Sequence, residues 1–258
     1  MSFEAEKAYV SYGNVYYDDG REVRLLHYVY ARPDIDELRG SPARVLAAID
    51  EYARTAEYLM NVGEHKGEII RRLIAETKPE VMVELGGYVG YSAILFGNAL
   101  KEAGGRRYIS LERNAEFGAV AASLVDLAGL SSVVKVEIGA CQDSLRRLHT
   151  KQTLEHIDML FLDHYKPAYL PDLKLCERLQ LISPGSVLAA DNVVRPGNPP
   201  YLAYVRASTE DKMHAAGGGG DGKQAFAKKW VDIELVESFE PSGDPDGVEI
   251  TRCVGRES

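Results

Sequence analysis

The sequence lacks several features that would place it in common classes of protein. Its three cysteines, Cys141, Cys176 and Cys253, are odd in number and widely spaced, which fits neither a disulfide framework nor a zinc site. No apolar run approaches the roughly 20 residues of a membrane-spanning helix. The N-terminus shows no basic segment followed by an apolar core, as a secretory signal does. We therefore expect a cytoplasmic protein with no membrane segment.

Basic residues are also scarce, since 30 Lys and Arg stand against 39 Asp and Glu, for a net charge of -9. A protein that binds the phosphate backbone of a nucleic acid needs a basic face, and the only dense basic candidate is Arg71-Arg72. Nucleic acid is therefore not expected as a partner. What is present, 258 residues of which 45% are hydrophobic, suffices for one large domain with a substantial core.

Short apolar runs alternate with helical patterns through the middle of the chain. The expected strands are Val81–Leu85, Tyr108–Leu111, Val133–Ile138, Ile157–Leu162 and Val187–Ala190. The expected helices between them are Tyr91–Ala103, Ala115–Ala128, Gln142–Leu148 and Pro171–Arg178. This alternation predicts parallel βαβ units, and the all-apolar strands predict a sheet covered by helices on both faces.

The two ends of the chain are organised differently. Residues 1–22 are tyrosine-rich and acidic without a clean period, and we interpret them as an extended arm before a single domain at residues 23–258. Helices are expected at Arg24–Arg32, Ser41–Met60 and Gly67–Thr77. A strand hairpin is expected at Trp230–Glu237 and Val248–Val254. The run Gly217–Gly220 predicts a flexible loop at about 215–222, because consecutive glycines hold neither helix nor strand.

The first strand of the alternating region leads into a glycine-rich turn. Gly86-Gly87 follows Val81–Leu85 directly, and in an open α/β sheet ligands bind at such carboxyl ends of strands. The dinucleotide pattern G-x-G-x-x-G is absent, and Glu84 stands where a phosphate site would avoid an acid. Glu112, at the end of the second strand, can accept hydrogen bonds from ribose hydroxyls. The pattern favours S-adenosylmethionine over NAD, although a tight turn with a solvated acid remains the alternative.

Two further strands end in acids. Asp163 follows Ile157–Leu162, and Asp191-Asn192 follows Val187–Ala190. If these strands are neighbours, the three side chains meet at one edge, and two carboxylates with an amide suit Mg²⁺. Unpaired carboxylates at such a separation repel, so a cation or the protonation of one of them is expected. Either aspartate alone would be an ordinary strand-end residue.

Lys166 follows Asp163 by three residues and is the candidate general base. Like charge from a metal and a sulfonium disfavours the ammonium form of a lysine, and the neutral amine can take a proton. By itself, Lys166 would be read as a surface lysine. His164 beside it is expected to pack against the cofactor or to be exposed, because the six histidines show no metal spacing.

At this point the sequence resembles the catechol O-methyltransferase family, from about Arg24 to Arg206. The motifs that carry the resemblance, in order, are Met60-Asn61-Val62-Gly63-x-x-Lys66-Gly67, Glu84-Leu85-Gly86, Gly90-Tyr91-Ser92, Gly139-Ala140-x-Gln142, Leu162-Asp163-His164, Lys166, Tyr169-Leu170-Pro171-Asp172 and Ala190-Asp191-Asn192-Val193. Each motif is weak, but the combination is specific.

The resemblance implies a Rossmann-like class I methyltransferase fold. Its sheet has seven mostly parallel strands with a reversed terminal strand, helices on both faces and additional N-terminal helices. It implies S-adenosylmethionine as methyl donor, Mg²⁺ on Asp163, Asp191 and Asn192, and Lys166 as base. The implied cofactor-binding positions are Val62, Glu84, Gly86, Tyr88, Ser92, Glu112, Arg113, Gly139, Cys141, Gln142, Asp163, His164 and Tyr165. The implied substrate positions are Tyr58, Met60, Lys166, Asn192, Pro196 and Glu237.

The chain departs from the family pattern at several of these positions. Cys141 replaces a serine, Tyr165 and Tyr58 replace tryptophans, and Arg113 stands where a methionine is frequent. The family glutamate that contacts the second hydroxyl is assigned to Glu237 by its Val-Glu-Ser context, with Glu240 as the alternative. These changes leave the chemistry intact and bear on the range of substrates.

We therefore expect an O-methyltransferase that acts on a small-molecule catechol, as a monomer or weak dimer. A related metal-dependent enzyme for caffeoyl-type or polyketide vicinal diols is the nearest alternative. A nicotinamide-dependent reductase is disfavoured by the missing G-x-G-x-x-G. A non-catalytic binding module is disfavoured because all expected metal ligands and the lysine are present.

Overall fold

The computed structural model of the chain describes residues 3–208, 210–212 and 229–255. The expected glycine-rich loop at about 215–222 lies outside these residues. The helices are α1 (Arg21–Tyr30), α2 (Ile35–Leu38), α3 (Pro42–Thr55), α4 (Gly63–Thr77), α5 (Tyr91–Glu102), α6 (Ala115–Leu127), α7 (Cys141–Thr150), α8 (Tyr169–Arg178) and α9 (Pro199–Arg206). The strands are β1 (Val81–Leu85), β2 (Arg107–Glu112), β3 (Val134–Ile138), β4 (Met159–Leu162), β5 (Val187–Ala190), β6 (Lys229–Phe239) and β7 (Pro245–Gly255).

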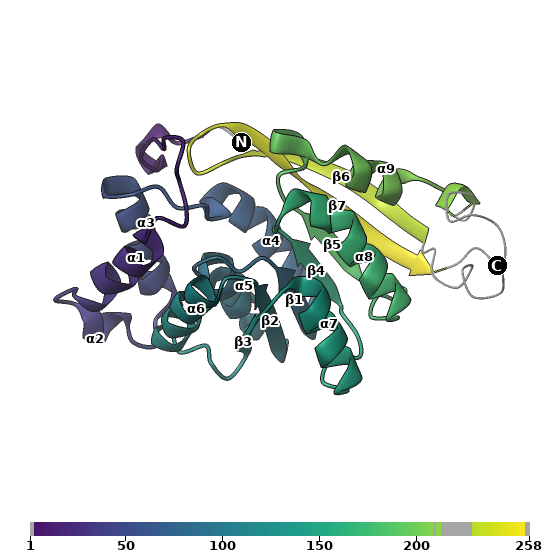
Figure 1. The fold of residues 1–258 in the computed structure, drawn as a ribbon, viewed down its shortest axis with the longest axis horizontal. Coiled ribbons are helices and arrows are strands. Elements are labelled where there is room, and N and C mark those ends of the chain that lie inside the picture. The colour runs from purple at the N-terminus through teal and green to yellow at the C-terminus, as the bar shows by residue number, and fades with distance from the viewer. Residues whose placement is uncertain (1–2, 209, 213–228, 256–258) are drawn as a thin grey trace.

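The seven strands form one sheet in the order β3-β2-β1-β4-β5-β7-β6 (Figure 1). Strands β1 to β5 pair in parallel, and β7 is antiparallel to both β5 and β6. The predicted fold class is therefore confirmed, including the reversed last strand. Because the chain runs outward from β1 to β3 and then returns to β4, the topological switch point lies between β1 and β4, where such sheets bind ligands.

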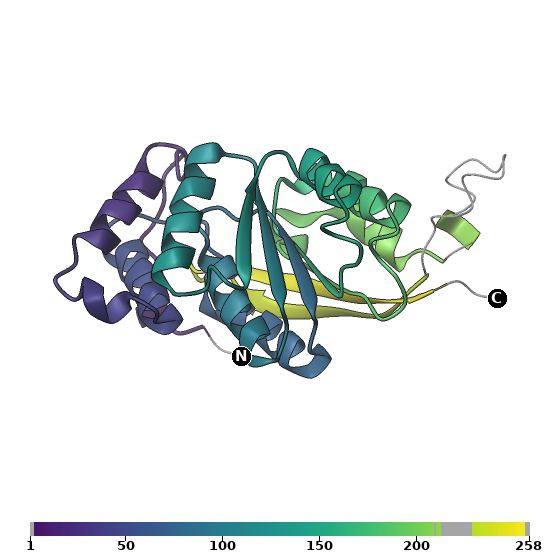
Figure 2. The same cartoon turned by 90° about the horizontal axis from the view of Figure 1, so that it is seen from below.

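Alternating strand residues feed two separate hydrophobic cores. Met82 and Phe161 face a core shared with the helices α1 and α3 to α6. Val83 and Leu160 face a second core, shared with α7, α8 and α9. Both faces of the sheet are thus covered, as the all-apolar strands predict. Figure 2 shows the N-terminal helices, in purple, gathered at one end of the molecule.

The connection between α3 and α4 differs from the expectation. Ser41 caps α3 as expected, since its Oγ accepts from the Arg44 N–H, but the helix ends at Thr55 rather than Met60. The buried Arg21 guanidinium donates to the Tyr58 carbonyl oxygen (2.8 Å), which occupies an acceptor that a continuing helix would use internally. Residues 56–62 are therefore a loop.

The C-terminal hairpin is longer than expected. Strand β6 runs to Phe239 and pairs with β7 from Pro245, so the turn is confined to residues 240–244. Helix α9 was not predicted from the sequence, because it is short and starts with two prolines. Pro tolerates the first helical turn, and the Asn198 side chain accepts from the Tyr201 N–H to start the helix.

Residues 3–20, the N-terminal arm as the structure describes it, lie along the body of the protein. The Tyr9 N–H donates to the Pro241 carbonyl (2.9 Å) in the hairpin turn, and the Val10 N–H donates to the Ala53 carbonyl (3.0 Å). The arm thereby joins the start of the chain to its C-terminal hairpin.

In the part of the chain that the structure describes, we find no helix with the length and apolar character needed to cross a membrane.

Candidate active site

A cavity of about 840 Å³ opens at the carboxyl ends of the central strands. It lies at the topological switch point, bounded by the turns after β1, β2, β4 and β5, by the α3–α4 loop and by the arm. The expected site residues that line it are Tyr58, Met60, Val62, Gly86, Tyr88, Ser92, Glu112, Arg113, Cys141, Gln142, Asp163, His164, Tyr165, Lys166, Asp191, Asn192 and Pro196. Segments from Tyr58 to Pro196 are thus brought to one place.

Three expected site residues do not line the cavity. Glu84 is fully buried and accepts from the Ser110 hydroxyl (2.5 Å), and burial raises its pKa to about 7. Gly139 shapes the turn after β3, with φ of 142° and its N–H on the Glu112 carbonyl oxygen. Glu237 is exposed on β6, whereas its alternative, Glu240, lines the cavity.

Glu112 is held rigidly at the cofactor side of the cavity. Its carboxylate accepts from the backbone N–H groups of Gly87 (3.2 Å), Tyr88 (2.8 Å) and Asn114 (2.7 Å). Burial raises the pKa of Glu112, and these N–H groups oppose that rise. A carboxylate offers about four acceptor positions, so this one retains capacity for a ligand hydroxyl.

The turn after β1 must come very close to the start of the turn that follows β4. Gly86 has φ of 94°, and a Cβ at this position would lie 2.6 Å from the Asp163 carbonyl oxygen. Only glycine combines this backbone conformation with such an approach. The sequence signal from Gly86 therefore reflects the contact between two ligand-binding turns, and not only a tight turn.

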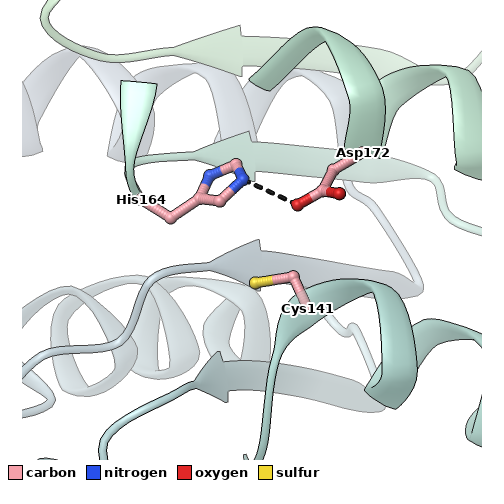
Figure 3. A group of neighbouring side chains, drawn as sticks. All are labelled: Cys141, His164 and Asp172. Atoms are coloured by element: carbon pink, nitrogen blue, oxygen red, sulfur yellow. Dashed lines mark hydrogen bonds and ion pairs between the residues drawn. The ribbon is translucent and has the colours of Figure 1, made fainter. Parts of the chain in front are cut away.

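Cys141, His164 and Asp172 form a cluster at the other end of the cofactor side (Figure 3). His164 Nε2 bonds the Asp172 carboxylate (2.9 Å), and its ring stacks on Tyr169 at 4.9 Å. The Cys141 sulfur lies within 4.8 Å of these atoms, but burial raises the pKa of its thiol to about 12. Because a thiol binds metals as the thiolate, the cluster fits a neutral ligand group better than a cation.

An acidic cluster occupies the opposite side of the cavity, around the fully buried Lys66. The Lys66 ammonium contacts the carboxylates of Asp191 (2.7 Å), Glu240 (2.7 Å) and Asp246 (3.0 Å). Burial by itself would lower the pKa of Lys66, but the three carboxylates raise it above its ordinary value. Lys66 is therefore a fixed positive charge that holds β5, β7 and the hairpin turn together.

Lys166 and Asn192 complete this cluster. The Lys166 ammonium contacts Asn192 Oδ1 (2.7 Å), Asp163 Oδ1 (3.3 Å) and the Tyr169 hydroxyl (2.6 Å). The Asn192 amide nitrogen donates to Asp246 and Glu240, which fixes the orientation of the amide. Asn192 Oδ1 and Asp163 Oδ1 consequently both point toward the Lys166 ammonium.

The charges of this acidic cluster do not balance. If all four were ionised, the carboxylates of Asp163, Asp191, Glu240 and Asp246 would outnumber the ammonium groups of Lys66 and Lys166 by two. Burial, together with the Asp191 charge, raises the pKa of Asp163 to about 6, and burial raises that of Glu240 to about 8. Buried charges require partners, so the donor set fits one divalent cation.

Several residues of the site were not assigned a role from the sequence. Lys66 lies in the motif from Met60 to Gly67, and this motif was the signal that could have identified it. The hairpin brings Asp246 to Lys66, and it also places Glu240, the alternative to Glu237, in the lining of the cavity. The arm contributes Tyr12, Tyr16 and Tyr17 to the lining, and nothing in their local pattern indicates it.

Comparison with known proteins agrees with this geometry. Residues 44–204 match the family described as O-methyltransferase. The catechol O-methyltransferase of Bos taurus is 40% identical over 196 residues, which cover 76% of this chain and 70% of the bovine protein. That of Mus musculus is 42% identical over 191 residues, covering 73% and 69%. A Bacillus cereus O-methyltransferase, solved in complex with SAH, has a TM-score of 0.58 at 22% identity, covering 91% of this chain and 97% of that one, which shows the shared fold.

The chain therefore belongs to the O-methyltransferase family. Within that family its identity to the bovine and mouse proteins makes it a catechol O-methyltransferase family member, as its motifs predicted. It is an S-adenosylmethionine-dependent methyltransferase.

Proposed function

We propose that this enzyme transfers a methyl group from S-adenosylmethionine to one hydroxyl of a catechol, with Mg²⁺ and Lys166 as the catalytic partners. The observation that carries the proposal is the acidic cluster, which has four carboxyl groups for two ammonium groups and lies in the same cavity as the anchored Glu112. The family relationship to catechol O-methyltransferases supports the choice of a catechol.

Asp163, Asp191 and Asn192 would hold the metal ion through two carboxylates and the fixed amide oxygen. Bound Mg²⁺ would supply Lewis acidity, which would lower the pKa of the diol hydroxyls. The chain's own contribution is position, since Lys66 and Lys166 hold these oxygens in place before a ligand arrives.

Lys166 would take the proton of one hydroxyl at Nζ as the neutral amine, the form that nearby positive charges of the metal ion and the sulfonium favour. The oxygen then attacks the sulfonium methyl carbon, the C–S bond breaks, and its electron pair stays on sulfur as S-adenosylhomocysteine. The resulting ammonium is stabilised by the Tyr169 hydroxyl and Asn192 Oδ1, which already lie 2.6 and 2.7 Å from Nζ. Since the donor is reactive, most of the acceleration should come from proximity and electrostatic alignment.

The diol ring would lie among Tyr58, Met60 and Pro196, which line the cavity beside the acidic cluster. Glu240, rather than the exposed Glu237, would accept from the second hydroxyl. The donor would be surrounded by Val62, Tyr88, Ser92, Arg113, Gln142 and Tyr165. Glu84, beneath the cavity, would act through Ser92, which lines the cavity and lowers the pKa of the Glu84 carboxyl group.

Caffeoyl-type or polyketide vicinal diols would use the same groups and are the alternative substrates. The cytoplasmic location and the monomeric or weakly dimeric state stay predictions.

Methyl transfer to a panel of vicinal diols, with and without a chelator, tests the proposal by mass spectrometry. Catechols should be methylated with Mg²⁺, and full chelation should abolish turnover until Mg²⁺ is returned. Calorimetric titration with Mg²⁺ alone should detect binding to the native chain and none to Asp191→Ala. Activity that survives full chelation would overturn the metal assignment, and failure to methylate any diol would overturn the function.

A further inference from the structure

The N-terminal arm adds an aromatic surface to the acceptor side of the cavity. The three arm residues that line the cavity, Tyr12, Tyr16 and Tyr17, are all tyrosines. The Tyr12 ring lies 4.4 Å from that of Tyr58 and 5.3 Å from that of Tyr16, and Tyr16 lies 5.3 Å from Tyr17. Starting from Tyr58, the aromatic surface therefore continues outward along the arm.

Tyr58 connects this aromatic surface to the acidic cluster. The residue is buried, and burial together with the Glu240 carboxylate raises the pKa of its hydroxyl well above the ordinary value. Its backbone carbonyl accepts from Arg21, and the same guanidinium donates to the arm at the Val15 carbonyl (3.1 Å). One buried side chain thus fixes both the acceptor loop and the arm.

A second set of contacts anchors the arm at Tyr9, which precedes the three cavity-lining tyrosines. Tyr9 is buried, and its hydroxyl bonds the Asp50 carboxylate (2.5 Å) and the amide of Asn61 (3.3 Å). Asp50 also accepts from the hydroxyl of Tyr91 (3.2 Å). Both Asn61 and Tyr91 line the cavity, so the arm is attached to the floor of the cavity itself.

The outer tyrosines retain free surface. Tyr12 is 41% exposed and Tyr17 is 47% exposed, although both line the cavity. Covering an exposed aromatic ring with an apolar or aromatic partner is favourable, because it removes apolar surface from water. A cavity of about 840 Å³ lies near the upper end of the usual range of roughly 300–1,000 Å³, which leaves room for more than a single-ring diol beside the donor.

We propose that the arm determines acceptor specificity, and that Tyr12 and Tyr17 bind an aryl group attached to the diol ring. This inference rests on the proposed function, because the diol must lie beside Tyr58 for its substituent to reach the arm. The enzyme then prefers two-ring diols to catechol itself, through KM more than through kcat.

The test compares catechol with 4-phenylcatechol on wild type, Tyr12→Ala, Tyr12→Phe and Tyr17→Ala. Tyr12→Ala should lower kcat/KM for 4-phenylcatechol about tenfold relative to catechol, which corresponds to one good aromatic contact. Tyr12→Phe keeps the ring and should keep the wild-type ratio. The KM for S-adenosylmethionine should stay unchanged in all four proteins.

Tyr30→Ala is the matched control, since Tyr30 is also 41% exposed but lies on α1 outside the cavity lining. This variant should leave the ratio of kcat/KM for 4-phenylcatechol to kcat/KM for catechol unchanged. If wild type methylates both diols and neither alanine variant changes their ratio, the arm inference is wrong while the proposed function stands. A rise in the KM for S-adenosylmethionine without a change in the ratio would assign the arm to the cofactor instead. Methylation of neither diol would fail the proposed function.

Discussion

The two sides of the cavity both present buried carboxylates but neutralise them in different ways. On the cofactor side, Glu112 is paired with backbone N–H groups and Glu84 with the Ser110 hydroxyl. On the acidic side, the carboxylates are paired with Lys66 and Lys166 and still exceed them in charge.

This difference separates two kinds of ligand. Neutral donors around a carboxylate leave its remaining acceptor positions to hydroxyl groups, as a ribose presents. Ammonium groups around several carboxylates fix the oxygens but leave net negative charge, which a cation can compensate. Four substitutions can break or sharpen the comparison.

The largest effect is expected from Lys166→Ala on the acidic side. Loss of a general base should lower kcat by about 100- to 10,000-fold, because Lys166 is the one amine among the described residues that contacts both Asn192 Oδ1 and Asp163 Oδ1. The KM for S-adenosylmethionine should stay close to wild type in steady-state assays. Lys151→Ala, at an exposed position, is the control. Equal losses of turnover and cofactor affinity would argue against a base.

A smaller effect is expected from Glu240→Gln. Replacing the carboxyl group that contacts Lys66 and Asn192 should lower kcat/KM for the diol by about 10- to 100-fold, as for a lost hydrogen bond to a charged group. Glu237→Gln, three residues earlier on exposed β6, should change it less than about twofold. The reverse ranking of the two variants would restore Glu237 to the site.

On the cofactor side, Glu112→Gln should act on the donor alone. Its amide loses acceptor capacity for the backbone N–H groups and for a ribose hydroxyl, so the KM for S-adenosylmethionine should rise about tenfold. Mg²⁺ affinity, measured by titration calorimetry, should not change. A weaker Mg²⁺ affinity would show that the two sides are coupled.

Glu84→Gln should have the smallest effect on turnover and a clear effect on stability. Because the folded-state pKa of Glu84 is raised to about 7, the folded protein binds more protons than the unfolded chain between about pH 4.5 and 7. The unfolding free energy of wild type should therefore fall as pH rises through this window, by roughly 3 kcal/mol at most. Urea unfolding at pH 5, 6, 7 and 8 should show a smaller fall in the variant. Identical pH profiles would mean that Glu84 titrates normally.

Much of the site was predictable because strand ends can be located in a sequence. Asp163 and Asp191 follow short apolar runs, and parallel neighbouring strands bring such ends to one edge. Glu84 was located correctly at the end of β1, but its burial was not predictable, since it depends on Ser92 and Ser110 from other elements.

The hairpin shows where sequence context misled. Val-Glu-Ser favoured Glu237, but β6 extends to Phe239, and side chains alternate along a strand. The position of Glu240 depends on a turn confined to residues 240–244 and on its contact with Lys66, which lies 174 residues earlier in the chain.

The sequence by itself determined the periodicity of the elements, the chemical types of the donors and the family. Periodicity and residue type are local properties, and the quoted motifs keep their order and spacing along the chain. Only the tertiary structure decided how the buried charges pair around Lys66 and that the arm tyrosines line the cavity. Pairing of this kind depends on distances between segments far apart in sequence, and on the burial that makes each unpaired charge costly.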